Sequence, residues 1–163
     1  MTQIRSAQPE DASAIIAIWN AIIRDTAITF TTREKSPEEI VSLIAECKTE
    51  NRPFVVAETA GQVTGFATLA PFRGGPGYAR TLELSVHLAP DARGQGTGRA
   101  LIRALEKNAA ANGCHSLIAG ISGENPDAVA FHERLGFREI ARLPEVGRKF
   151  DRWIDLVLLQ KFL

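Results

Sequence analysis

The segment TLELSVHLAPDARGQGTGRALI, residues 81 to 102, carries most of the information on the fold of this chain. Residues 81 to 88 alternate between apolar and polar side chains and stop just before a proline, which predicts a central β-strand. Three glycines then stand at every second position: Gly94, Gly96 and Gly98. A helical apolar pattern runs from there to about Asn112, where Gly113 closes it. The segment therefore predicts a strand, a tight turn and a helix in direct succession.

The glycine-rich turn has the properties of an anion site. Glycine lets the backbone turn tightly and bring its N–H groups against a ligand, and a helix N-terminus adds unpaired donors and about half a positive charge. Arg93 and Arg99 flank the turn and suit charge-assisted contacts with phosphate oxygens. The spacing fits neither a Walker loop nor a dinucleotide-binding fingerprint. A pyrophosphate is the predicted occupant, and a glycine-rich connection without a ligand is the alternative.

Helices and strands are predicted on both sides of this segment. The stretches that begin at Asp11 and Ser36 have helical apolar spacing, and these two residues are the predicted N-caps. Two β-rich runs meet at Ala60 and Gly61, which predicts a hairpin. The remaining predicted elements are a strand near 3–5, a strand over 115–121, a helix over 125–136 and strands over 137–143 and 153–159.

This order of elements predicts an α/β (α+β) fold in a single domain, residues 1–163. The expected sheet is mixed and mostly antiparallel, with parallel pairing only around the central strand and helices on both faces. The chain is long enough to bury a core without a disulfide or metal staple. No repeat, linker or low-complexity stretch divides it.

Composition and charge narrow the classes of partner. The 19 basic and 19 acidic side chains balance, which argues against nucleic acid or an acidic membrane as the main partner. No apolar run approaches a membrane span, and the charged N-terminus is unlike a signal peptide, so we expect a cytoplasmic protein. The two cysteines, Cys47 and Cys114, lack the spacing of a zinc site or disulfide framework, and no metal is expected.

Three motifs together resemble the GCN5-related N-acetyltransferase (GNAT) superfamily. The stretch Arg93-Gly94-Gln95-Gly96-Thr97-Gly98 matches its Q/R-x-x-G-x-G/A signature. NPDAVAFHERLGF, residues 125 to 137, resembles the later motif in which an asparagine opens a helix that ends in Gly-Phe. With KFDRWIDLVLLQ, residues 149 to 160, the likeness to the phosphinothricin acetyltransferase branch extends over nearly the whole chain.

This resemblance implies an acetyl-CoA site on splayed strands. Its backbone contacts with the pantetheine arm would come from Val86, His87 and Leu88, and Asn125 would lie near the reactive end of the cofactor. The pyrophosphate would be held by Arg93, Gly94, Gln95, Gly96, Thr97, Gly98 and Arg99. Relatives in this branch acetylate the amino group of phosphinothricin, methionine sulfoximine or methionine sulfone, and they are commonly dimers, so a homodimer is expected.

Glu83 is the candidate general base. It shares a face of its strand with Ser85, and a carboxylate on a central strand should be paired or functional. The resemblance assigns the base to this position, acting directly or through water. An ion pair with Arg80 or Arg73 is the alternative.

His132 stands where many members of the superfamily carry a tyrosine that acts as general acid. Histidine could protonate the thiolate, hydrogen-bond to the sulfur or relay a proton, and a purely structural bond to a backbone carbonyl is the alternative. A backbone N–H of Val86 or His87 would polarise the thioester carbonyl. The side chains of His87 and His115 are expected to be structural.

The predicted acceptor site combines a cationic loop with two aromatic walls. Arg73 and exposed backbone N–H groups could clamp a carboxylate. The predicted substrate-binding residues are Phe30, Arg73, Gly74, Gly75, Tyr78, Glu83, Leu84 and Ser85. The rival interpretation of the loop is an ordinary surface turn. Other acceptors remain open, namely a polyamine, an aminoglycoside or a protein amine, and so does a non-catalytic acyl-CoA-binding module.

Overall fold

The computed structural model describes residues 1–163 as seven strands in one sheet with four α-helices. The strand order is β1-β2-β3-β4-β5-β7-β6, and only β4 and β5 pair in parallel. The elements are β1 Thr2–Ser6, α1 Ala12–Asp25, α2 Pro37–Thr49, β2 Phe54–Thr59, β3 Gln62–Pro71, β4 Thr81–Leu88, α3 Thr97–Ala111, β5 Ser116–Ser122, α4 Pro126–Glu133, β6 Arg138–Lys149 and β7 Arg152–Phe162. The predicted mixed, mostly antiparallel sheet is confirmed.

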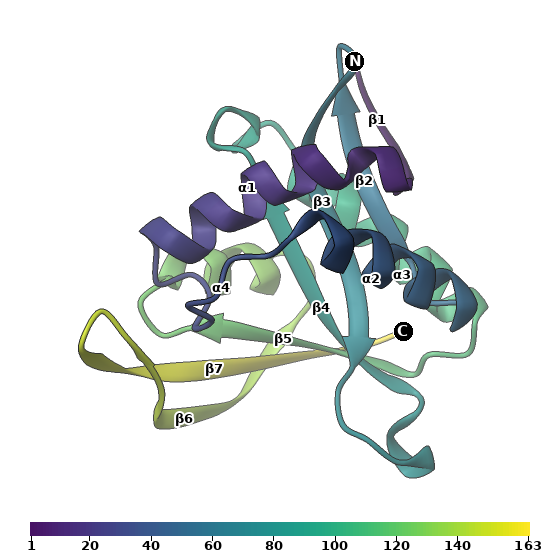
Figure 1. The fold of residues 1–163 in the computed structure, drawn as a ribbon. Helices are drawn as coiled ribbons and strands as arrows, with labels where there is room; N and C mark the ends of the chain where they lie inside the picture. Colours follow the sequence, from purple (N-terminus) through teal and green to yellow (C-terminus); the bar gives the residue numbers. More distant parts are fainter.

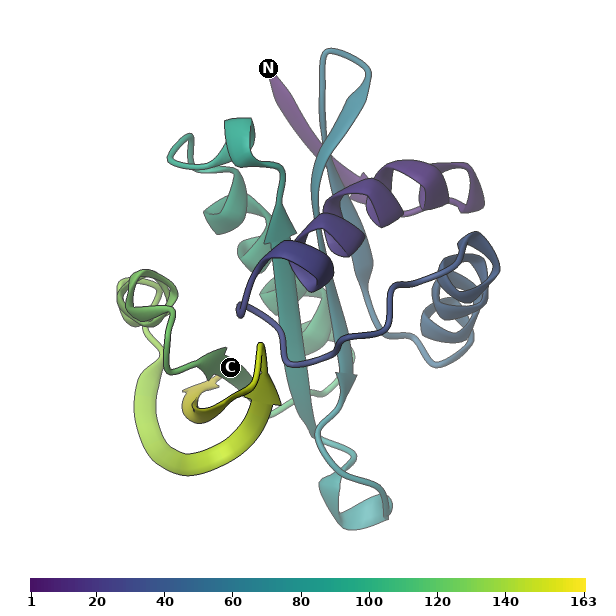
Figure 2. The ribbon, with the colours of Figure 1, turned by 60° about the vertical axis from the view of Figure 1, so that its left-hand side comes forward.

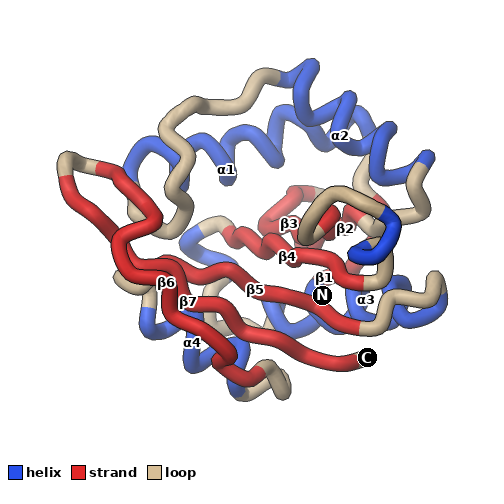
Figure 3. The backbone as a smooth tube through the Cα atoms, turned by 90° about the horizontal axis from the view of Figure 1, so that it is seen from below, coloured by secondary structure: helices blue, strands red, loops and turns tan.

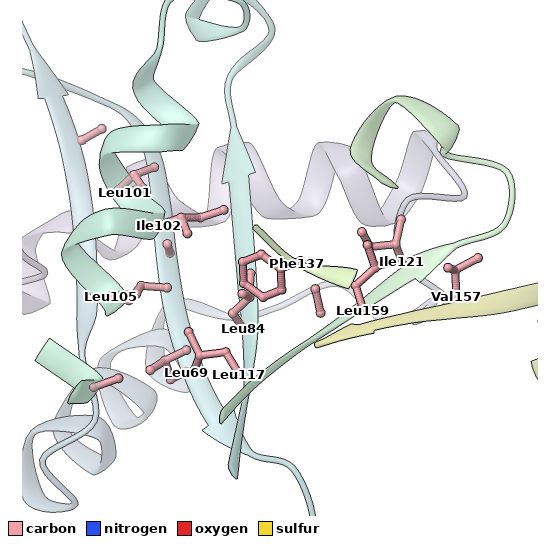
Figure 4. Close-up of a cluster of buried hydrophobic side chains, with 14 residues drawn as sticks. Leu69, Leu84, Leu101, Ile102, Leu105, Leu117, Ile121, Phe137, Val157 and Leu159 are labelled. Atoms are coloured by element: carbon pink, nitrogen blue, oxygen red, sulfur yellow. The ribbon is translucent and has the colours of Figure 1, made fainter. Parts of the chain in front are cut away.

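Helices cover both faces of the sheet, as predicted. Figures 1 and 2 show α1 and α2 on one side and α3 on the other, and Figure 3 shows β4, β5 and β7 curving beneath the layer of α1 and α2. A core cluster around Leu101 and Leu105 fills the interface between α3 and the sheet (Figure 4). A second cluster around Ile15 and Phe66 fills the interface between the sheet and the layer of α1 and α2. The sheet therefore separates two cores.

The N-termini of the first two helices differ in how well their caps were predicted. Ser36 forms the predicted capping box with Glu39, each side chain accepting a hydrogen bond from the other residue's backbone N–H. Asp11 makes no cap hydrogen bond to α1; its carboxylate accepts from the Gln8 N–H and from Arg5. Asp11 thus occupies the predicted N-cap position, but its side chain does not cap the helix because these two partners occupy its oxygens.

Three short 3-10 turns and a longer strand were not predicted. The turns are Pro9–Asp11, Pro76–Tyr78 and Pro90–Ala92, and each begins with a proline, whose fixed φ suits a first helical position. The expected strand over 137–143 continues to Lys149, because β6 pairs with β7 again beyond an irregularity between Leu143 and Gly147.

Strands β4 and β5 separate halfway along their length. Their parallel register runs from Thr81 with Ser116 to Leu84 with Ala119 and stops there. Beyond that point β4 pairs only with β3, up to Leu88 opposite Gly65, and β5 pairs only with β7. The predicted splay is confirmed, and it leaves one edge of residues 85–88 without a strand partner.

Candidate active site

The glycine-rich turn presents a row of unpaired backbone donors. Gly94 and Gly96 adopt left-handed φ values of +74° and +82°, which L-residues with a side chain rarely adopt. The backbone N–H groups of residues 94–99 make no hydrogen bond within the chain, whereas the Ala100 N–H returns to the Gly96 carbonyl. Consecutive free donors at the N-terminus of a fifteen-residue helix form a site for an anion.

The side chains of the turn leave these donors accessible. Arg93 and Arg99 are exposed and form no ion pair, and the Gln95 amide donates to the Asp91 carbonyl at 2.6 Å. Thr97 is buried where α3 begins. Gly98 is packed so closely that a Cβ there would lie 3.1 Å from Phe131 of α4. The sequence did not single out Phe131, which fixes how α4 meets the start of α3.

The unpaired edge of β4 offers only backbone to a ligand. The side chains of Val86 and Leu88 pack against the core beneath α3. His87 is buried on the opposite face, with ring centroids 5.7 Å from Trp19 and 5.3 Å from Phe66. Contacts from this stretch to a cofactor would therefore be made by main-chain groups, and the side chain of His87 has the structural position that was expected.

Burial of His87 predicts an acid-sensitive fold. Desolvation lowers the pKa of His87 from 6.5 to about 4. Between these values the unfolded chain binds a proton that the folded chain does not, so the free energy of unfolding falls by about 3 kcal/mol from pH 7 to pH 4 through this group. His87→Phe should lose correspondingly less stability over this range in urea unfolding at the two pH values. An equal fall in the free energy of unfolding in both proteins would contradict the lowered pKa of His87.

Glu83 is half-buried and has no hydrogen-bond or ion-pair partner. It lies on the face of β4 turned away from α3, which it shares with Ser85. Burial raises the pKa of the Glu83 carboxyl. The alternative of an ion pair with Arg80 or Arg73 is wrong, because Arg80 donates to the Gly113 carbonyl and Arg73 lies over the Phe72 ring. The carboxylate is free to accept a proton.

His132 is buried on α4 with one ring nitrogen unsatisfied. Its Nδ1 is 2.8 Å from the Ala128 carbonyl oxygen, and since a carbonyl only accepts, Nδ1 carries the proton. Nε2 is buried without a partner, and the rings of Phe131 and Phe137 meet the imidazole edge-on. Burial lowers the pKa of His132. The neutral ring therefore offers a lone pair at Nε2, not a proton.

Asn125 caps α4 and keeps a free amide. Its Oδ1 accepts a hydrogen bond from the Ala128 N–H at 3.3 Å, and its Nδ2 donates to no group in the chain. The residue follows β5 on the side where β4 and β5 have separated, so its amide donor stays available to a ligand.

The structure does not gather all the predicted acceptor residues around Glu83. Arg73, Gly74, Gly75 and Tyr78 line a groove at the C-terminal end of α3, which Glu83 does not line. The side chain of Leu84 points into the core beneath α3 (Figure 4), so it can reach an acceptor only through its backbone.

Phe30 packs against the β6–β7 hairpin. A Cβ at Gly147 of β6 would be 2.5 Å from its ring, and Lys149 beside it donates to the Thr29 carbonyl at 2.9 Å. These contacts hold the loop between α1 and α2 against the hairpin. They position Phe30 through packing.

Two classes of feature are missing from the described chain. No helix has the length and apolar character needed to cross a membrane. No group of three or more His, Cys, Asp or Glu side chains is arranged to hold a metal ion. Both cysteines are free, with Cys47 buried and Cys114 half-buried.

Comparisons with known proteins agree with this geometry. The model of the acetyltransferase (GNAT) domain family matches residues 4–158. The chain is 35% identical over 161 residues to the L-methionine sulfoximine/L-methionine sulfone acetyltransferase of Pseudomonas aeruginosa, a match that covers 96% of this chain and 92% of the relative.

Solved structures extend the likeness to the whole fold. A GNAT superfamily phosphinothricin acetyltransferase from Sinorhizobium meliloti, in complex with acetyl-CoA, superposes with a TM-score of 0.95 at 31% identity, over 99% of this chain and 88% of that one. A ribosomal-protein-alanine N-acetyltransferase from Brucella melitensis has a TM-score of 0.95 at 38% identity, over 99% of each chain. The resemblance expected from the motifs is confirmed, and the chain belongs to the GNAT acetyltransferase family.

Proposed function

We propose that this protein transfers the acetyl group of acetyl-CoA to the amino group of a small amino-acid-like acceptor of the methionine sulfoximine, methionine sulfone or phosphinothricin type. One observation carries the proposal. Glu83 is a half-buried carboxylate without a partner on β4. The same strand has the unpaired edge at residues 85–88 and is followed by the glycine-rich turn. A base beside an anchored thioester is what acetyl transfer to an amine requires.

The residues of the chain fit acetyl-CoA at three points. The free N–H groups of residues 94–99, with Arg93 and Arg99, suit the pyrophosphate. The unpaired edge at residues 86–88 suits the amides of the pantetheine arm, and Asn125 offers an amide donor beyond it. Bound there, acetyl-CoA supplies an activated acetyl group as a thioester.

Glu83 would make the amine nucleophilic. An α-amine has a pKa of about 7.7–8.0 and is mostly protonated at neutral pH. Glu83 takes its proton, directly or through water, and the nitrogen attacks the thioester carbonyl carbon. The carbon–sulfur bond breaks and the sulfur leaves with the electron pair. The acylated nitrogen loses its second proton, and one proton is passed to the sulfur to give the thiol. A backbone N–H of Val86 or His87 would stabilise the oxyanion.

His132 would act on the sulfur as a hydrogen-bond acceptor and proton relay rather than as a direct acid. Its proton lies on Nδ1, toward Ala128, and its unpartnered Nε2 can accept from a thiol or a water. A proton that returns to the thiolate would then pass through water held at Nε2. The structural alternative, a bond to a backbone carbonyl alone, leaves Nε2 without a function.

His132→Phe is expected to lower kcat about tenfold and to leave the melting temperature unchanged or slightly higher. A positioned acid or base typically contributes about 10²–10⁴-fold to a rate, and a relay that acts through water is expected to contribute less. The variant also removes the unpartnered Nε2 together with the Nδ1 hydrogen bond to the Ala128 carbonyl, and these two effects on stability oppose each other. Thiol release and thermal unfolding measure the two effects. Undiminished kcat across the pH range would leave His132 with a structural role.

The identity of the acceptor is tested by a panel of amines. Free thiol is followed with acetyl-CoA and methionine sulfoximine, methionine sulfone, phosphinothricin, spermidine, an aminoglycoside or a peptide with N-terminal alanine. Release with the first three acceptors is the expected result. The peptide represents the second candidate, a protein amine, which the 38% identity to the ribosomal-protein-alanine N-acetyltransferase favours. Release with the peptide alone would overturn the amino-acid acceptor, and no release at all would indicate a non-catalytic acyl-CoA-binding module.

Three further proposals concern the protein as a whole. We infer that residues 1–163 act as one domain, since both cores pack on one sheet.

We infer a homodimer, supported by the exposed apolar side chains of Val146, Phe150 and Trp153 on the β6–β7 hairpin. We infer that the protein works in the cytoplasm, where acetyl-CoA is available as donor.

A further inference from the structure

We propose that Gly120 is a positioning residue for Glu83, and that its missing side chain provides the space in which the carboxylate lies. Gly120 lies on β5, two residues beyond Ile118, which is the parallel-register partner of Glu83. Side chains two residues apart on a strand share a face, so position 120 is on the face of Glu83. A Cβ built on Gly120 would lie 3.0 Å from Oε1 of Glu83.

The surroundings of this space are apolar and come from the next strand. The same Cβ would lie 3.6 Å from Leu156 and 3.8 Å from Leu158 of β7, and Leu158 is the register partner of Gly120. The Glu83 carboxylate thus lies near aliphatic groups and contacts no cation. Gly120 itself is exposed, so the space is open to an acceptor from solvent. This arrangement explains a carboxylate that is desolvated and yet unpaired.

An alanine at position 120 would disturb the carboxylate and little else. The backbone of Gly120 has no positive φ, and its other two neighbours would be at ordinary van der Waals distance. Only Oε1 of Glu83 would have to move, by a few tenths of an ångström, and it is the end of a flexible side chain. The fold tolerates such a shift. Catalysis is less tolerant, because a misplacement of about 1 Å can lower a rate about 10²-fold.

The inference rests on the proposed function of Glu83 as base and is tested by a double-mutant cycle. Gly120→Ala is introduced into the wild type and into Glu83→Gln, which keeps the shape of the side chain without a basic carboxylate. We expect kcat to fall about tenfold in the first background and less than twofold in the second. The KM for acetyl-CoA and the melting temperature should stay close to those of each parent. Gly77→Ala, at an exposed glycine with open space and ordinary φ, is the matched control and should leave kcat unchanged.

The outcomes separate this inference from the proposed function. A tenfold loss that is equally large in the Glu83→Gln background would show that Gly120→Ala acts on something other than the carboxylate, which overturns the positioning role. An unchanged kcat in the wild-type background would also overturn it, even if Glu83→Gln alone is inactive. If Glu83→Gln keeps full kcat, the proposed base itself is wrong, and the positioning role falls with it.

Discussion

Glu83→Gln is expected to lower kcat by about 10²–10⁴-fold, the contribution of a positioned general base. The amide has the size of the carboxylate but cannot accept the proton of the amine at neutral pH. Glu83 forms no hydrogen bond or ion pair in the structure, so the variant removes no contact that holds the site together. Free thiol, measured at pH 7 with saturating acetyl-CoA and methionine sulfoximine, gives the ratio directly.

Affinity and stability separate this loss from a structural defect. The dissociation constant of acetyl-CoA should change by less than about twofold. Burial raises the pKa of Glu83, so the folded state disfavours the charged form, and removing the charge should hold or raise the melting temperature at pH 7. Glu133→Gln, at an exposed glutamate without an ion pair, is the control. Full kcat in Glu83→Gln would rule out the base.

The second large effect is expected at the anion site. Replacing both Arg93 and Arg99 with alanine should raise the KM for acetyl-CoA about 10²-fold, because each charge-assisted contact with phosphate is worth about 1.5 kcal/mol or more. The value of kcat at saturation should change little, since neither residue lies near the proposed base. Initial rates over a range of acetyl-CoA concentrations measure both constants.

A control with the same change in net charge isolates the turn. Arg103 and Lys107 are exposed on α3, one and two turns beyond Arg99, and form no ion pair. Replacing both with alanine removes the same charge from the neighbouring turns of α3 and should raise the KM for acetyl-CoA less than about threefold at moderate salt. Equal effects of the two double variants would indicate a general electrostatic field instead of direct contacts at the turn.

The order and type of the elements were predictable because the deciding signals are local. The alternation over residues 81 to 88, the three glycines and the Ser36 capping box each act within a few residues, and the structure contains the strand, turn and helix that they predict. Asp11 shows the limit of such signals. Its cap hydrogen bond depends on whether Arg5 reaches it from β1, and that follows from how the strand and helix pack.

The candidate site was predictable in its residue types and less in its arrangement. The side of β4 on which Glu83 lies followed from alternation, whereas the absence of a partner depends on where Arg73 and Arg80 point, which local sequence does not specify. Gly120 was missed because its role depends on the register between β4 and β5. A glycine within a buried strand was the available signal, since such positions often mark a close approach.

The central claim is that the turn at residues 94–99 anchors the cofactor while Glu83 performs the chemistry. The most direct test compares acetyl-CoA with S-acetylpantetheine, a donor that lacks the pyrophosphate, in three proteins: wild type, Glu83→Gln and the Arg93/Arg99 double alanine variant. The account predicts that Glu83→Gln lowers kcat by the same factor with both donors, and that the arginine variant raises KM for acetyl-CoA only. An equal rise in KM for both donors in the arginine variant would contradict it.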